Sequence, residues 1–204
     1  MGITKIAVMV SGRGTNLQAL IDAEKNGIIK SGKISLVISD NPDAYALDRA
    51  KKYGVETAVI TKRQCGGTEN FETALINLLK EKEIGLIVLA GFMTILGERF
   101  TSTFRNSIIN VHPSLIPSFC GKGFYGLRVH EAALNYGVKV TGATVHYVNE
   151  IPDGGEIIMQ KAVEVKDGDT PEILQKRVME NAEWVILPLA TELICGKINE
   201  KGRN

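Results

Sequence analysis

The arrangement of apolar residues along the first half of the chain constrains its fold more than any other feature. Short apolar runs, typical of buried strands, alternate with segments whose apolar residues recur at the spacing of one helix face. The strand-like runs are residues 5–10, 34–39, 57–60, 86–90 and 108–111, and the helical segments are residues 17–23, 44–53, 71–80 and 98–104. This repeated order predicts a doubly wound α/β fold, in which helices cover both faces of a mostly parallel, twisted sheet.

The second half of the chain follows a different pattern. A stretch rich in Gly and Pro, residues 113–126, precedes a predicted helix at 129–136 and two strand-like runs at 143–148 and 157–165. Two strands separated by a short loop pair antiparallel, so we expect them to form an antiparallel edge of the sheet.

A long helix is expected near the C-terminus. Thr170 can cap its first turn, with Pro171 at the first helical position, where a missing N–H costs nothing. Pro188 lies well inside the continuation and is expected to kink or interrupt it, because proline removes a hydrogen bond and clashes with the preceding turn.

Composition excludes several classes of protein. The chain has 204 residues, 44% hydrophobic and 23% charged, with a net charge of +1, which suits one globular domain with no basic surface for nucleic acid. The sequence has neither a leader-like segment nor an apolar run long enough to span a bilayer, so we expect a cytoplasmic protein without a membrane partner. Its three cysteines are far apart and lack a CxxC spacing, which predicts no disulfide framework and no metal site.

A glycine-containing turn, residues 11–16 (SGRGTN), lies directly between the first predicted strand and the first predicted helix. Glycines let the backbone approach an anion, and a helix start offers free N–H groups, so the turn is suited to hold a phosphate. A dinucleotide motif would need a third glycine where Leu17 stands, and no Walker lysine follows. The other interpretation is a tight turn whose helix is capped by Thr15 or Asn16.

Asn110 and His112 stand two residues apart at the end of the fifth predicted strand, so their side chains should project from the same face. Open α/β sheets bind ligands at the carboxyl ends of their strands, and this pair combines an amide donor with a potential acid or base. The alternative is a core histidine whose ring is satisfied by a backbone carbonyl.

Asp153 lies in the loop between the two late strands, within EIPDGG at residues 150–155. An aspartate in a turn most often bonds its own backbone, and the spacing alone favours that role. If the fold brings this carboxylate close to His112, however, it would favour the charged imidazolium and orient the ring.

The order of motifs SGxGTNLQAL, LAGFMTIL, INVHPSLIPSF, GATVHYV and DGGEII strongly resembles the folate-dependent phosphoribosylglycinamide formyltransferases of purine biosynthesis. The resemblance runs from residue 5 to about residue 193. It implies the formyltransferase fold in a single domain, residues 1–204. A Rossmann-like half that binds the ribonucleotide phosphate would span about residues 1–105, and a catalytic and folate-binding half about residues 106–204.

The resemblance also implies which residues bind the two substrates, glycinamide ribonucleotide and the co-substrate 10-formyltetrahydrofolate. The ribonucleotide phosphate would bind the backbone of Gly12, Arg13, Gly14, Thr15 and Asn16, and its ribose hydroxyls would bind Glu183. The folate would contact Met93, Thr94, Ile95, Leu96, Asn110, Val148, Asn149, Glu150, Ile151, Pro152 and Asp153, with Arg63 as a candidate for its glutamate tail.

The implied reaction is attack of the substrate's neutral amine on the formyl carbon, through a tetrahedral intermediate and without a metal. Protonated His112 and the amide of Asn110 would stabilise the developing oxyanion, each by about 3 kcal/mol. Asp153 would keep His112 charged and, through a water, help to remove the proton that the amine loses.

The chain departs from the family pattern in two places. It has Thr94 where related chains often carry an arginine, and residues 66–69 (GGTE) lack another arginine before Phe71, so the contacts of the glutamate tail stay open, with Lys62 or Arg63 as substitutes. The segment 118–126 (SFCGKGFYG), here called the flap, is longer than in many relatives. Its glycines and Lys122 suggest either a mobile segment that meets an anionic ligand or a long surface loop.

Other functions stay open at this point. The same three polar residues could serve a formyltetrahydrofolate hydrolase or a formyltransferase that acts on another amine. A non-catalytic nucleotide-binding module would need only the glycine turn, and a nicotinamide dehydrogenase is conceivable because Asp40 follows the second predicted strand. The oligomeric state is expected to be a monomer or a homodimer. His146 is expected to be an inner, hydrogen-bonded residue rather than a proton carrier, and His130 a surface or structural residue.

Overall fold

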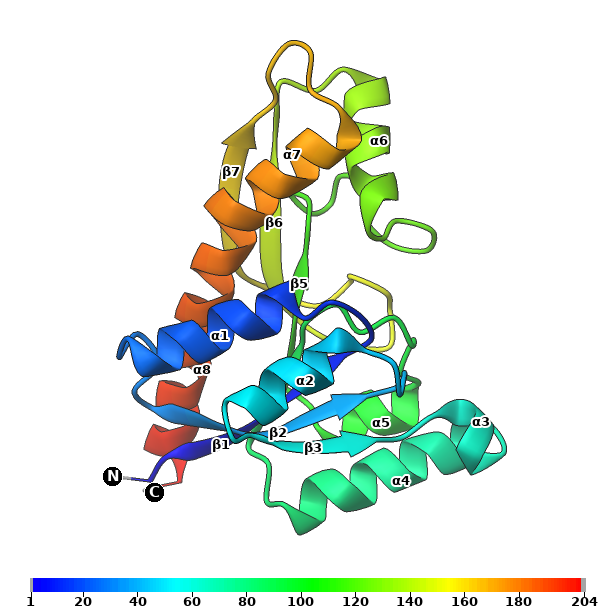
Figure 1. Cartoon of the computed structure of the whole chain (residues 1–204), viewed down its shortest axis with the longest axis vertical. Helices are drawn as coiled ribbons and strands as arrows, with labels where there is room; N and C mark the ends of the chain where they lie inside the picture. Colours follow the sequence, from blue (N-terminus) through cyan, green and yellow to red (C-terminus); the bar gives the residue numbers. More distant parts are fainter. Residues whose placement is uncertain (1, 203–204) are drawn as a thin grey trace.

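The computed structural model describes residues 2–202, so the outermost residues of the expected domain, 1 and 203–204, lie outside it. The chain forms one seven-stranded sheet with helices packed on its two faces (Figure 1). In chain order the elements are β1 (Thr4–Val10), α1 (Thr15–Lys25), β2 (Gly32–Ser39), α2 (Tyr45–Lys52), β3 (Glu56–Val59), α3 (Lys62–Cys65), α4 (Thr68–Glu81), β4 (Leu86–Leu89), α5 (Glu98–Thr103), β5 (Ile108–His112), α6 (Leu127–Tyr136), β6 (Val140–Tyr147), β7 (Ile157–Glu164), α7 (Pro171–Val178), η1 (Met179–Glu183) and α8 (Trp184–Lys201).

The sheet has the strand order β3-β2-β1-β4-β5-β6-β7. Strands β1 to β5 pair parallel with one another, whereas β6 pairs antiparallel with both β5 and β7. The predicted doubly wound sheet with an antiparallel edge is therefore confirmed. The chain first places β2 and β3 on one side of β1 and then β4 and β5 on the other side. The loops that follow β1 and β4 therefore run in opposite directions, and sheets of this kind bind ligands between such loops.

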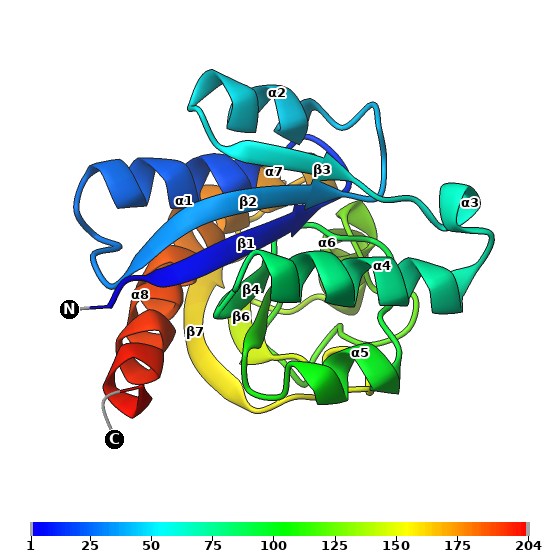
Figure 2. The same cartoon turned by 90° about the horizontal axis from the view of Figure 1, so that it is seen from below.

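Side-chain alternation on β1 assigns the two faces of the sheet. Ile6, Val8 and Val10 belong to one core cluster together with residues of α1, α2 and α8, while Ala7 and Met9 belong to a second cluster with α4 and α5. Figure 2 shows α1 and α2 on one side of β1 and β2, and α4 and α5 on the other. The period-two pattern of a strand buried on both faces thus places helices on each side.

Two local features differ from expectation. The interruption expected at Pro188 is not found, because α8 continues through it; the hydrogen-bond register changes earlier, in the π-helical segment Met179–Glu183. Short π-helical segments within α-helices are frequently found at functional sites. The four-residue helix α3 was not predicted, since so short a segment has no periodicity to detect.

Thr170 caps α7 as predicted: its Oγ1 accepts a hydrogen bond from the N–H of Ile173 at 3.3 Å, and Pro171 begins the helix. Among the helices of residues 2–202, none is long and apolar enough to cross a membrane.

Candidate active site

Asn110 and His112 extend from the same face of β5, as their spacing predicts. His112 is 4% exposed, and its Nε2 lies 2.8 Å from the backbone oxygen of Phe119 in the flap. Because a carbonyl oxygen can only accept, Nε2 carries the hydrogen, which leaves Nδ1 as the nitrogen that can gain or lose a proton.

Asp153 reaches this pair from the β6–β7 loop. Its Oδ2 lies 3.5 Å from Nδ1 of His112 and accepts a hydrogen bond of 2.9 Å from the backbone N–H of Gly121. The role that its spacing favoured, a bond to its own turn, is therefore wrong. The residue has a left-handed backbone, with φ of 55°, which turns the carboxylate toward β5.

His146 also belongs to this cluster, although the sequence interpretation did not place it there. It is 1% exposed on β6, directly opposite Asn110 in the strand register. Its Nδ1 lies 2.7 Å from the backbone oxygen of Tyr147, and its Nε2 lies 3.2 Å from Nδ2 of Asn110 and 3.6 Å from Oδ1 of Asp153. With the hydrogen on Nδ1, Nε2 accepts from the amide and fixes its orientation.

Burial decides the protonation of His112. Desolvation lowers the pKa of His112, and it outweighs the carboxylate of Asp153 and the carbonyl of Phe119, which raise it. Burial alone would raise the pKa of Asp153, but the imidazoles of His146 and His112 and the N–H of Gly121 hold it below its ordinary value. Asp153 therefore acts on His112 in the expected direction, favouring its charged form, but burial opposes this effect and outweighs it.

A pocket of about 590 Å³ lies above this cluster. Its floor is the end of β5, one wall is the loop after β4, and the flap covers it. The lining residues are Gly91, Phe92, Met93, Ile95, Asn110, Val111, His112, Pro113, Gly121, Lys122, Gly123, Phe124, Tyr125, Gly126, Pro152 and Asp153.

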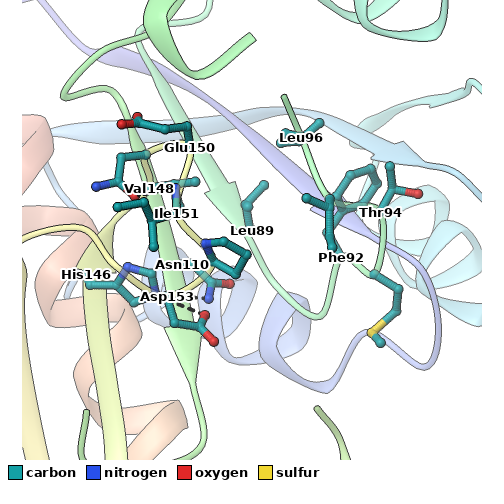
Figure 3. Close-up of a pocket in the computed structure, with 14 residues that line it drawn as sticks. Leu89, Phe92, Thr94, Leu96, Asn110, His146, Val148, Glu150, Ile151 and Asp153 are labelled. Atoms are coloured by element: carbon teal, nitrogen blue, oxygen red, sulfur yellow. Dashed lines mark hydrogen bonds and ion pairs between the residues drawn. The ribbon is translucent and has the colours of Figure 1, made fainter. Parts of the chain in front are cut away.

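A second, smaller pocket of about 130 Å³ adjoins the first (Figure 3). It brings together the residues expected to contact a folate: Met93, Thr94, Ile95, Leu96, Asn110, Val148, Asn149, Glu150, Ile151, Pro152 and Asp153 all line it. Met93, Ile95 and Ile151 are each more than half exposed, at 54%, 66% and 58%. Apolar side chains grouped at a pocket rim are typical of a surface that an apolar ligand covers.

Two of the predicted folate residues differ from the rest: Thr94 lines the pocket but its hydroxyl is bonded elsewhere, and Arg63 lies outside the pocket. The Oγ1 of Thr94 donates a hydrogen bond of 2.7 Å to Oδ2 of Asp40, and Figure 3 shows its side chain on the far side of Phe92 from Asp153. Arg63 is an exposed residue of α3 and is not among the residues that line either pocket. Neither side chain adds a charge to the pocket walls.

The glycine turn after β1 is held rigidly by its neighbours. Gly14 has φ of 71°, and a Cβ at this position would lie 2.6 Å from Cβ of Ala46, so only glycine fits. Arg49 donates a hydrogen bond of 2.9 Å to the backbone oxygen of Arg13, and the N–H of Met93 donates one of 2.8 Å to Oγ of Ser11. The turn therefore abuts the pocket loop.

The start of α1 has no side-chain cap, and its N-cap is Gly14. The alternative interpretation, in which Thr15 or Asn16 caps the helix, is wrong. Asn16 instead donates a hydrogen bond of 2.7 Å to Oε2 of Glu183, so the structure brings the turn and the predicted ribose contact together. An uncapped helix start with free N–H groups favours an anion.

Glu183 is the last residue of the π-helical segment η1, and its carboxylate is almost completely buried. Burial raises the pKa of Glu183 to about 7, against the opposing effect of the hydrogen bond from Asn16. A carboxylate poised near neutrality beside an anion-binding turn is a candidate for ligand binding. Within residues 2–202, no group of three or more His, Cys, Asp or Glu side chains could hold a metal ion.

Comparisons with known proteins identify the family. The model of the formyl transferase family, described as "Formyl transferase", matches residues 4–191. The chain is 42% identical over 200 residues to a human protein described as the trifunctional purine biosynthetic protein adenosine-3; this covers 98% of the chain but 19% of that protein.

Two further relatives have a length close to that of this chain. It is 41% identical to the phosphoribosylglycinamide formyltransferase of Haemophilus influenzae over 185 residues, which cover 91% of this chain and 84% of the relative. The crystal structure of glycinamide ribonucleotide transformylase 1 from Symbiobacterium toebii matches with a TM-score of 0.89 and 39% identity, covering 96% of this chain and 89% of that one. On this similarity over nearly its full length, the chain belongs to the phosphoribosylglycinamide formyltransferases, within the formyl transferase family.

Proposed function

We propose that this chain transfers the formyl group of 10-formyltetrahydrofolate to the primary amine of glycinamide ribonucleotide, giving formylglycinamide ribonucleotide and tetrahydrofolate. The observation that carries the proposal is the convergence of Asn110, His112 and Asp153 on a pocket next to the glycine turn at residues 11–16. The printed functions of relatives such as the Haemophilus influenzae enzyme support the same reaction.

The folate is proposed to bind in the smaller pocket and along its rim. Met93, Ile95 and Ile151 would cover the faces of the pteridine ring, and backbone groups of the β6–β7 loop would meet its polar edge. Flat apolar walls with a few polar groups are suited to a heteroaromatic ligand. The side chains of Asn110 and Asp153 line the same pocket, so a formyl group attached to the bound folate would lie within their reach.

The ribonucleotide is proposed to bind with its phosphate at the uncapped start of α1 and its ribose hydroxyls at Glu183. The backbone of Gly12, Arg13, Gly14, Thr15 and Asn16 supplies the N–H groups for the phosphate. A carboxylate accepts two hydrogen bonds from a vicinal diol, and Asn16 already orients that of Glu183. The amine end of the substrate then extends past Ser11 and Met93 into the larger pocket.

In the proposed reaction, the amine nitrogen forms a bond to the formyl carbon and the carbonyl oxygen becomes an oxyanion. The Nε2–H of His112 and the amide of Asn110 donate hydrogen bonds to that oxygen. The ionised carboxylate of Asp153 accepts the proton that the amine loses. The bond from the formyl carbon to the folate nitrogen then breaks, and that nitrogen takes up a proton.

The test is ultraviolet absorbance of 10-formyltetrahydrofolate incubated with the protein, with and without glycinamide ribonucleotide. Loss of the formyl folate that requires the ribonucleotide is the expected result, with formylglycinamide ribonucleotide identified by mass spectrometry. Equal loss in both samples would indicate a hydrolase and would contradict the proposal. No loss in either sample would indicate a binding module.

A further inference from the structure

The flap, residues 118–126, makes its hydrogen bonds to the proposed catalytic side chains through its own backbone. The oxygen of Phe119 accepts from Nε2 of His112 at 2.8 Å, and the N–H of Gly121 donates to Oδ2 of Asp153 at 2.9 Å. Both contacts come from peptide groups separated only by Cys120. The flap thus occupies the donor of one catalytic residue and the acceptor of the other.

The two peptide groups match the polarity of the reacting groups. An amide carbonyl on the N–H of His112 is equivalent to a formyl oxygen, and an amide N–H on the carboxylate of Asp153 is equivalent to the N–H of an attacking amine. Nε2 of His112 has a single N–H, which the oxygen of Phe119 already occupies, so this donor cannot serve the flap and a formyl oxygen at the same time. Occupation by the flap and occupation by substrate are therefore mutually exclusive.

The docked flap has a strained backbone. Phe119 has φ of 50°, a left-handed conformation that costs a residue with a side chain free energy unless surrounding contacts hold it. Those contacts are present: Ser114 Oγ donates to the oxygen of Ser118 at 2.5 Å, and the ring of Phe119 packs edge-on to Phe124 and Tyr136, at 6.4 and 6.0 Å between ring centroids. The contacts with His112 and Asp153 help to retain this conformation.

We propose that the docked flap is an autoinhibitory contact, in which the backbone of Phe119 and Gly121 occupies the catalytic groups until substrate displaces it; the formyl donor alone suffices, because its oxygen takes the place of the Phe119 oxygen on His112. The inference rests on the proposed function for the identity of the competing groups. It differs from a lid, because a lid closes over bound substrate, whereas this segment must leave its contacts before substrate can bind productively. Positive φ at Gly121 and Gly123, 85° and 96°, gives the segment glycines at which it can change conformation.

Cys120 is a native reporter of the docked state, because it lies between the two contact residues and its Sγ donates to the oxygen of Pro117 at 3.3 Å. The experiment measures alkylation of Cys120 by iodoacetamide, with peptide mapping by mass spectrometry and Cys65 as the internal standard. His112→Ala removes the donor to Phe119, and Asn110→Ala is the matched control on the same face of β5 with no bond to the flap. We expect alkylation about tenfold faster in His112→Ala and within twofold of wild type in Asn110→Ala.

Asp153→Ala removes the acceptor for Gly121 and is also expected to increase the rate about tenfold. Asp153 raises the pKa of Cys120, although burial raises it more, so each rate is divided by the thiolate fraction obtained from its own pH dependence. Asn149→Ala, in the same loop, serves as the control, since among residues 2–202 the side chain of Asn149 accepts a hydrogen bond from the N–H of Ile151 and makes none to the flap. Corrected rates within twofold of wild type in both His112→Ala and Asp153→Ala would overturn the inference. Alkylation of the buried Cys195 in either variant would reveal unfolding. In that case, hydrogen exchange of the flap amides, compared with that of the α4 amides, would replace alkylation as the measure of flap docking.

A second measurement separates the autoinhibitory contact from a lid. Wild-type protein is alkylated with and without 10-formyltetrahydrofolate, and equilibrium dialysis of the same samples verifies that the folate is bound. Faster alkylation of Cys120 with bound folate supports displacement of the flap; an unchanged or slower rate with bound folate overturns it. If no folate binds, the proposed function fails, and the ligand-free variants still decide the inference about the flap.

Discussion

Two glycine-containing segments flank the proposed active site, and they use their backbone in opposite ways. The turn at residues 11–16 is held by hydrogen bonds with Ala46, Arg49 and Met93, and it leaves the start of α1 without a side-chain cap. The flap at residues 118–126 directs its own carbonyl and N–H groups onto His112 and Asp153. The comparison shows that glycine content alone does not distinguish a preformed anion site from a segment that competes with a ligand; the hydrogen-bond partners do.

The largest expected effect concerns His112, one of the two side chains that the flap contacts. His112→Ala should lower kcat by about a hundredfold to a thousandfold, because it removes a donor to the oxyanion. The dissociation constant of glycinamide ribonucleotide, measured by calorimetry, should change less than threefold, since the ribonucleotide phosphate would bind on the other side. A near-normal kcat would remove His112 from the mechanism.

Gly14→Ala tests whether the turn is as rigid as its contacts indicate. The added Cβ would meet Cβ of Ala46 at 2.6 Å, at a backbone φ of 71°, so we expect a loss of about 2–4 kcal/mol in the free energy of unfolding, measured in urea. The matched variant is Gly123→Ala in the flap, where φ is 96° but nothing lies within 4 Å of the added Cβ. It should cost about 1 kcal/mol. Equal losses in the two variants would contradict the difference between the segments.

Glu183 should make the affinity for the ribonucleotide depend on pH. Its pKa of about 7 means that the carboxylate ionises as the pH rises from 6 to 8, and we expect ribonucleotide affinity to increase by about tenfold over that range. Glu183→Gln should remove this dependence, while the titration of the substrate phosphate stays common to both proteins. Calorimetric titrations at several pH values would measure it, and an identical pH profile in the variant would contradict the role of Glu183.

The same shift has the opposite sign for stability. Because the folded-state pKa of Glu183 lies above the ordinary value of 4.5, its protonated form stabilises the fold fully below pH 4.5, and that contribution is lost as the pH rises through about 7. Unfolding free energies of wild type and Glu183→Gln should therefore diverge between these two pH values and run parallel above them.

The smallest expected effect concerns the folate glutamate tail. Arg63 is exposed on α3 and does not line the described pockets, so Arg63→Ala should change KM for a monoglutamate 10-formyltetrahydrofolate by less than twofold. Lys122→Ala in the flap is the comparison, because Lys122 lines the larger pocket. A greater increase of KM in Arg63→Ala than in Lys122→Ala would restore Arg63 as a folate contact.

The parts of the fold and site that depend on local pattern could be predicted from the sequence. Strands flanked by helices, the shared face of Asn110 and His112, and the cap at Thr170 all follow from residue spacing. The approach of Asp153 to β5 depends on a left-handed residue in a loop, and its sequence favoured a local bond. His146 was recognised as an inner residue but not as a neighbour of Asn110, because the register between antiparallel strands is set by tertiary packing.

The π-helical segment Met179–Glu183 has a consequence for any alignment of this chain with its relatives. Relative to a regular α-helix, such a segment accommodates one extra residue, and one residue corresponds to a rotation of about 100° around the helix axis. The amphipathic phase of α7 is thereby offset from that of α8, so each helix buries its own face and Glu183 points at Asn16. Deleting a single residue here would preserve two good helices and yet turn one of them out of phase with the sheet beneath it.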